Sequence, residues 1–189
     1  MNEIEFSHIV AKFLNERLAT AQYRGISLVE GVDAKAKHNY IVRHFTFQKG
    51  NDGWKVLAGA DDLDIILYKD VVPKVQFPAN LFRFTGTGVR GDGVIIPLVT
   101  IELKVKFPST HDLIASNKIA SDIKTLFPHC RCYFLSYQKS RSENSLRDPN
   151  VLRLAQCFDR SFIDWENIKE DLWQKILSHL KDLKQSEII

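Results

Sequence analysis

Apolar residues recur at the spacing of an amphipathic helix in three stretches of the chain. The first follows Asn2, a favourable N-cap residue, and runs to about Gln22. The second runs from about His111 to Phe127, and the third follows Asp164 and runs from Trp165 to about Lys184. We read the apolar stripe of the third helix as an intramolecular packing surface first and as a dimer interface second.

Between the first two helices, the chain alternates apolar and polar residues or forms short β-branched and aromatic runs, which predicts strands. These runs cover residues 26–30, 40–47, 54–59, 61–67 and 94–106, and another follows the second helix at 131–137. A strand, a helix and a strand of this length form a crossover that normally gives parallel strands. The predicted fold class is therefore α/β, with a central mixed sheet flanked by helices in the order helix, several strands, helix, strand, and a C-terminal amphipathic helix.

The length of 189 residues predicts a single domain over 1–189, with a core at about 1–137 and a C-terminal loop and helix at 138–189. An apolar content of 44% and a charged content of 26% are typical of a soluble globular protein. The acidic first residues and the lack of a long apolar run predict neither a signal peptide nor a membrane span. The odd number of cysteines, 3, suits a reducing compartment, so we expect a cytoplasmic protein.

Two of the predicted strands carry charged residues on one face. Between Thr100 and Lys106 the even-numbered positions, among them Glu102 and Lys104, point one way, and the odd-numbered apolar positions point to the core. Glu102 and Lys104 are then separated by roughly 6.6 Å, close enough to serve one reacting atom. In the 61–67 run, Asp62 and Asp64 share a face, and their carboxylates would converge beside Lys104 if the two strands are neighbours.

Paired carboxylates form a hard-oxygen site suited to Mg²⁺, and a neighbouring lysine can orient or deprotonate a water. A Glu-x-Lys pair on a strand is by itself most often a surface ion pair of little energetic value. Here the strand is strongly apolar on its other side, and the acidic strand precedes it. This combination favours a catalytic site.

Asp64 before the apolar residues 65–67, followed by Glu102-Leu103-Lys104 inside an apolar strand, resembles the signature of the PD-(D/E)XK nuclease superfamily. Leu63 stands where that family has its proline. The resemblance implies a restriction-endonuclease-like core, in which the elements follow the order αβββαβ. It also implies that Asp64, Glu102 and the Leu103 backbone carbonyl ligate Mg²⁺, for which Mn²⁺ can substitute, with Asp62 as a reserve ligand. Lys104 would position the attacking water and offset charge that develops on the phosphate.

The resemblance implies a Mg²⁺-dependent DNA endonuclease that hydrolyses phosphodiester bonds. Among such enzymes we favour a restriction-type, sequence-specific cutter of double-stranded DNA, because a stand-alone domain with a candidate dimer stripe suits a palindromic site. A structure-specific or repair nuclease and an RNA endonuclease on the same fold are the alternatives within the superfamily. A non-catalytic nucleic-acid-binding module is the alternative from another class. Some nucleases of this superfamily place a further acid on the first helix, where Glu16 is available, although a solvated Glu16 is the favoured interpretation.

Basic side chains outside the catalytic pair are candidates for phosphate contacts, which supply most sequence-independent affinity. One candidate, Arg90, lies in the 70–93 insertion, where residues 86–91 match G-x-G-x-x-G. Because a strand rather than a helix follows, we interpret those glycines as a hairpin tip and not as a nucleotide fingerprint. A solvated loop is an equally good interpretation of the polar segment after residue 138. The remaining candidates are Lys106, Lys118, Lys139, Arg141 and Arg147.

Overall fold

A mixed five-stranded sheet forms the centre of the molecule, in the strand order β1-β4-β6-β7-β8. The computed structural model describes residues 1–23, 25–30, 40–51, 53–73, 76–78, 80–85, 93–106, 108–137 and 156–189. The pairs β1/β4 and β4/β6 are antiparallel, and β6/β7 and β7/β8 are parallel. The strands of this large sheet are β1 (Ser27–Glu30), β4 (Ile65–Pro73), β6 (Gly93–Lys104), β7 (Arg131–Ser136) and β8 (Arg160–Ile163).

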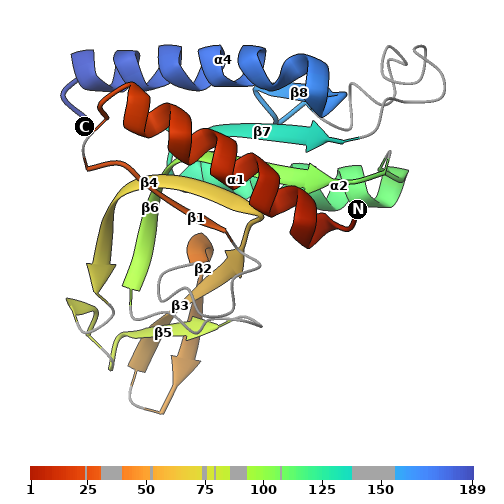
Figure 1. The fold of residues 1–189 in the computed structure, drawn as a ribbon. Helices are drawn as coiled ribbons and strands as arrows, with labels where there is room; N and C mark the ends of the chain where they lie inside the picture. The colour runs from red at the N-terminus through yellow and green to blue at the C-terminus, as the bar shows by residue number, and fades with distance from the viewer. Residues whose placement is uncertain are drawn as a thin grey trace.

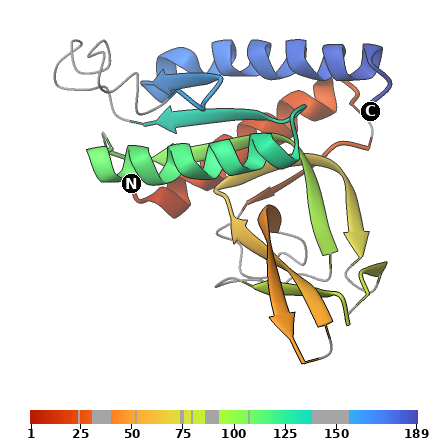
Figure 2. The same ribbon diagram turned by 180° about the vertical axis from the view of Figure 1, so that it is seen from behind.

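Helices cover both faces of the large sheet, as Figures 1 and 2 show from opposite sides. Helices α1 (Glu3–Thr20) and α4 (Trp165–Gln185) pack on one face, and α2 (Thr110–Leu126) packs on the other. The chain runs from β6 through α2 into the parallel strand β7, so the predicted crossover is confirmed. The predicted α/β class with a mixed sheet is confirmed as well. None of the helices in the described residues is both long and apolar enough to cross a membrane.

The first two helices begin with reciprocal caps. The Asn2 side chain accepts from the Glu5 backbone N–H, and the Glu5 carboxylate accepts from the Asn2 N–H. Ser109 and Asp112 make the same pair of bonds at the start of α2. Each cap satisfies backbone donors that have no partner inside the helix. The helix starts near Asn2 and Ser109 are therefore fixed by local chemistry.

The main core lies between the large sheet and the helices α1 and α4. Phe6 of α1 packs edge-on against Trp165 of α4, with ring centroids 6.0 Å apart, and both side chains are almost completely buried. Each large apolar side chain that leaves water contributes roughly 1.5–3 kcal/mol before entropy is counted. From Val99 onward the odd-numbered positions of β6 lie in this core, as the alternation predicts for Ile101 and Leu103.

His179 of α4 is a polar member of the same region. It is 7% exposed, and its Nε2 lies 3.2 Å from the Leu98 carbonyl oxygen. Burial lowers the pKa of His179, although the hydrogen bond to Leu98 acts in the opposite direction. The folded state therefore favours the neutral imidazole.

A second sheet contains β2 (Tyr40–Gly50), β3 (Gly53–Asp62) and β5 (Phe82–Thr85), in the order β2-β3-β5. Strands β2 and β3 form an antiparallel hairpin, and β5 runs parallel to β3. The hairpin extends away from the large sheet on the side opposite α4 (Figures 1 and 2). Its base is held to α2 by Arg43, whose guanidinium lies 3.3 Å from the Asp122 carboxylate.

The prediction that residues 61–67 form one strand is wrong. Strand β3 ends at Asp62 in the small sheet, and β4 begins at Ile65 in the large sheet. Leu63 and Asp64 form the link between the two sheets. The apolar and polar alternation continues through this link, so it gives no sign of the change of direction.

The start of α4 also differs from the prediction. Asp164 occupies the N-cap position, but its φ of 70° is left-handed and its side chain makes no cap bond. Its carboxylate instead accepts from the Asn167 side-chain amide at 2.8 Å. Strand β8, just before it, was not predicted from the sequence.

Candidate active site

The candidate site lies at the C-terminal end of β6, where β4 begins. Ile65 pairs with Ile101 in the antiparallel register, so Asp64 comes just before the first paired residue. Its Oδ2 accepts a hydrogen bond from the Leu103 backbone N–H at 2.7 Å. The side chain of Asp64 therefore binds the β6 backbone just beyond the first paired residue of β4. The expectation that the two acidic segments are neighbours is confirmed.

Glu102 lies on the opposite face of β6 from the main core and beneath α2. Its Oε1 accepts from the Ser116 hydroxyl at 3.0 Å and lies 3.1 Å from the Lys104 ammonium. Glu102 is 15% exposed and Thr100, two residues earlier, is 3% exposed. Helix α2 therefore covers the polar face of β6 at Thr100 and Glu102. The charged pair sits at the edge of a buried layer.

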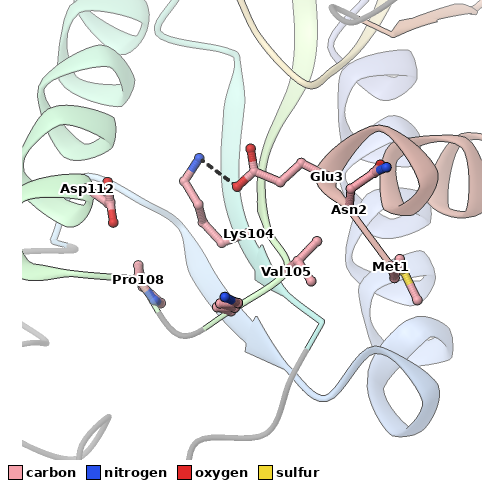
Figure 3. A pocket seen from close by; sticks show the side chains of 8 residues that line it. Met1, Asn2, Glu3, Lys104, Val105, Pro108 and Asp112 are labelled. Carbon is pink, nitrogen blue, oxygen red and sulfur yellow. Dashed lines mark ion pairs between the residues drawn. The ribbon is translucent and has the colours of Figure 1, made fainter.

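Lys104 connects the strand to the first helix. Its Nζ lies 3.7 Å from Glu3 Oε1 at the start of α1, and Figure 3 draws both side chains. Burial lowers the pKa of Lys104, but the charge and hydrogen bond of Glu102, with smaller contributions from Glu3 and Asp64, outweigh burial and raise it overall. Lys104 is therefore a cation at neutral pH.

An open pocket of about 280 Å³ lies beside Lys104. Figure 3 places the Lys104 side chain between the start of α1 and the start of α2. This pocket gives the Lys104 side chain access to solvent. Its lining residues are Met1, Asn2, Glu3, Lys104, Val105, Lys106, Pro108 and Asp112.

Asp64 has the strongest electrostatic perturbation at the site. Burial, followed by the charge of Glu102, raises its pKa from 3.8 to about 7. The Leu103 amide and the Lys104 ammonium lower the pKa, but they do not compensate. The repulsion between the Asp64 and Glu102 carboxylates and the burial of Asp64 disfavour its charged form. A bound cation would reduce both effects.

The oxygen atoms at this site fit a hard divalent cation. Asp64 uses Oδ2 and Glu102 uses Oε1 for the contacts above, and no other described residue is a partner of Asp64 Oδ1 or Glu102 Oε2. The Leu103 N–H points to Asp64, and the carbonyl of a strand residue points to the same edge as its N–H. Mg²⁺ in proteins commonly uses one or two carboxylates together with waters and substrate phosphates. Within the described residues, no group of three or more His, Cys, Asp or Glu side chains could hold a metal ion.

The sequence offered two additional acids for this site, Asp62 and Glu16. The side chain of Asp62 lies outside the described residues, while its backbone pairs with Tyr40 in the small sheet. Glu16 is exposed on α1 and lies 13 positions after Glu3. At about 1.5 Å per helical residue, that separation is roughly 20 Å. Glu16 is therefore solvated, as the favoured interpretation held.

Of the predicted phosphate contacts, Lys106 is exposed and lines the pocket beside Lys104. Lys118 is 71% exposed and forms an ion pair with Asp122 one helical turn later. It lies on α2, two positions after the Ser116 that holds Glu102. The other predicted contacts lie outside the described residues: Arg90, Lys139, Arg141 and Arg147.

Sequence reasoning missed two contributors to the site, Ser116 and Glu3. Ser116 is 4% exposed and occupies the buried stripe of α2 between Leu113 and Ala120. A lone hydroxyl in an apolar stripe was the available signal. Glu3 lies in the first turn of α1, where the helix dipole favours acidic residues. Its position in the sequence therefore gave no reason to expect a contact with Lys104.

A scan against protein-family models and a search of curated proteins each find no match for this chain. The site is defined by its own geometry: an Asp from the link between two sheets and a Glu-x-Lys from the adjoining strand β6.

Proposed function

We propose that the chain is a Mg²⁺-dependent endonuclease that hydrolyses phosphodiester bonds in DNA. The observation that carries the proposal is the hydrogen bond from the Leu103 amide to Asp64, which places Asp64 at the Glu102-Leu103-Lys104 segment. This contact joins two residues that are distant in the sequence into one acidic site.

Asp64 and Glu102, with the Leu103 carbonyl, would hold the cation. When bound, Mg²⁺ supplies charge neutralisation and activation of a water for attack on phosphorus. Ser116 and Lys104 both bind Glu102 Oε1, so they fix the orientation of that carboxylate and leave its second oxygen for a ligand. This is the preorganisation that a catalytic metal site requires.

Lys104 would act as a charged hydrogen-bond donor. Because its pKa is raised, it stays protonated at neutral pH and is a poor base. The ammonium can orient a water and stabilise the negative charge that develops on the phosphate oxygens. Glu3 is near enough to Lys104 to hold the ammonium in place before substrate arrives.

The topology of the large sheet supports the same proposal. The elements α1, β1, β4, β6, α2 and β7 follow one another in the large-sheet layers, with the small sheet inserted between them. This order is similar to the αβββαβ core of the PD-(D/E)XK superfamily. Within that superfamily we propose sequence-specific cleavage of duplex DNA. A dimer would use a surface other than the α4 stripe, because that stripe is buried in the core.

The experiment is incubation of purified protein with supercoiled plasmid in Mg²⁺ and, separately, in EDTA. Glu102→Gln keeps the size of the side chain and removes its charge, and Glu16→Gln is the matched control on an exposed helix position. We expect cleavage by the wild type and by Glu16→Gln in Mg²⁺ only, and no cleavage by Glu102→Gln.

The pattern of products decides the finer assignment. Discrete bands support a sequence-specific enzyme, and a smear supports a nonspecific or structure-directed one. Absence of cleavage on several plasmids, or cleavage that persists in Glu102→Gln, contradicts the proposed active site. Binding without cleavage would instead identify a non-catalytic nucleic-acid-binding module.

A further inference from the structure

Three aromatic side chains project into solvent from the small sheet. Phe45 and Phe47 of β2 and Trp54 of β3 are 46%, 72% and 63% exposed. In the antiparallel register Phe47 lies opposite Val56, and Trp54 lies opposite Lys49. Since directly opposed residues and alternate residues share a face, all three rings and Lys49 lie on one face. We call it the aromatic face.

The aromatic face begins inside the protein and continues out of it. At its inner end Ala58 is buried with Val94 of β6. At the β5 edge, Phe82 and Phe84 pack edge-on against Phe77, with ring centroids 5.6 and 5.3 Å apart. The fold thus provides partners for the inner rings. It leaves the outer three exposed on the hairpin that projects from the body (Figure 1).

The small sheet also carries basic side chains. Lys49 shares the face, and Lys55 and Arg83 lie on the opposite face of the same small sheet. In the strands of the small sheet the acidic residues are Asp61 and Asp62, at the end of β3 away from the exposed rings. In the sequence, Asp52 lies between β2 and β3. Among the described residues, these three cations have no ion-pair partner. A polyanion is the complementary ligand.

The geometry of the rings favours single strands over duplexes. Phe45 and Phe47 are two residues apart on one strand, a separation of about 7 Å. This is roughly twice the 3.4 Å rise between stacked bases in a duplex, so the rings match bases that are spread apart. Only unpaired bases present their faces to a protein ring, and such stacking is tolerant of sequence.

We propose that the aromatic face binds single-stranded nucleic acid, with bases stacked on Phe47 and Trp54 and the backbone near Lys49. Phe45, which is less exposed, extends the same platform toward the body of the protein. This binding is independent of the proposed nuclease activity, because it uses no residue of the carboxylate site.

The test measures affinity in EDTA, so that cleavage cannot occur. The probe is a labelled oligo(dT) of about 15 nucleotides, near the upper size bound by one compact domain. A matching oligo(rU) and a blunt duplex are the comparison ligands. Loss of one stacking ring, in Phe47→Ala or Trp54→Ala, should weaken oligo(dT) binding roughly tenfold. Phe47→Tyr, which keeps a ring, should restore most of the affinity.

Tryptophan fluorescence gives a second readout at the platform itself. The protein has 3 tryptophans. Trp165 and Trp173 are 2% and 5% exposed, so Trp54 is the one that solvent and ligand can reach. Oligo(dT) should quench the exposed component of the emission, and Trp54→Phe should abolish this quenching while keeping most of the binding. Ile188→Ala, an exposed apolar position outside the small sheet, is the matched control.

Each outcome bears on the proposal. Ring-dependent binding of oligo(dT) or oligo(rU), with quenching of Trp54, supports it, and the ratio of the two affinities identifies the preferred strand. Unchanged oligo(dT) affinity in folded Phe47→Ala and Trp54→Ala overturns it. An equal loss of duplex affinity overturns the single-strand assignment. Self-association of the wild type that disappears in the alanine variants would make the aromatic face a contact between copies of this chain and overturn the proposal.

Discussion

Asp64→Asn should increase the stability of the metal-free protein at neutral and alkaline pH. The amide side chain of this variant keeps an oxygen for the Leu103 N–H but carries no charge beside Glu102. The pKa of Asp64 is raised from 3.8 to about 7, so the unfolded chain releases its proton at lower pH than the folded chain. The folded wild type therefore loses stability, relative to the variant, as pH rises through this interval and no further above it.

The size of the effect follows from the same shift. One pKa unit corresponds to 1.36 kcal/mol, so a rise of about 3 units gives about 4 kcal/mol between about pH 4 and pH 8. Asp64 is partly exposed and shares its titration with Glu102, so we expect about 2–4 kcal/mol in experiment. Most point substitutions destabilise a protein, which makes a gain of this size diagnostic.

The assay is urea unfolding of wild type and Asp64→Asn in EDTA at several pH values. A stability difference that is constant with pH, or that grows as pH falls, refutes the reasoning. Asp112 is a control for which stability should depend on pH in the opposite direction, because its hydrogen bonds with Ser109 lower its pKa. Its contribution is present at neutral pH and is lost on acidification. Adding Mg²⁺ at alkaline pH should stabilise the wild type more than Asp64→Asn.

The remaining predictions address single side chains. Lys104→Ala should reduce cleavage by about 100-fold or more while the protein stays folded by circular dichroism, because it removes a charge donor from the transition state; unchanged cleavage would remove Lys104 from the mechanism. Ser116→Ala should increase the Mg²⁺ concentration needed for half-maximal cleavage, because Glu102 loses one of two contacts on Oε1; the same requirement as the wild type would argue against a positioning role. Leu103→Asp should prevent folding, since it buries an unpaired charge in the main core, and a cooperative thermal transition would contradict that packing. His179→Gln should flatten the loss of stability as pH falls below about 6.5, because the lowered pKa of His179 makes protonation favour unfolding; identical pH profiles for variant and wild type would contradict it.

Local chemistry made the helices and most strands predictable from the sequence. Asn2 caps α1 through a bond to a backbone amide three residues away, so the information needed for that boundary lies within one turn. The alternation in β6 likewise assigns Ile101 and Leu103 to the core and Glu102 to the other face. A side-chain period of two residues determines faces without any long-range contact.

The link at Leu63 and Asp64 was beyond this kind of reasoning. Its alternation fits one strand, although the chain passes there from the small sheet to the large sheet. Which sheet a segment joins depends on partner strands that are distant in the sequence. A two-residue period shows which face a side chain lies on, but it does not identify those partners. For the same reason the alternation in β6 did not show that α2 covers its polar face.

The charged residues proposed for the site could be picked out from the sequence, but the residues that hold them in position could not. Asp64, Glu102 and Lys104 follow from charge placed within apolar segments. Ser116 becomes part of the site only when α2 packs on the sheet, and Glu3 only when α1 begins beside Lys104. These contacts are set by tertiary packing.

The most direct test of the central claim is a double-mutant cycle on cleavage with Asp64→Asn, Glu102→Gln and the double variant. If the two carboxylates hold one cation, each single variant should lose most of the activity, and the double variant should lose little more. Losses that multiply would show that the two carboxylates act independently. Substantial cleavage by the double variant would contradict the assignment of Asp64 and Glu102 as the catalytic pair.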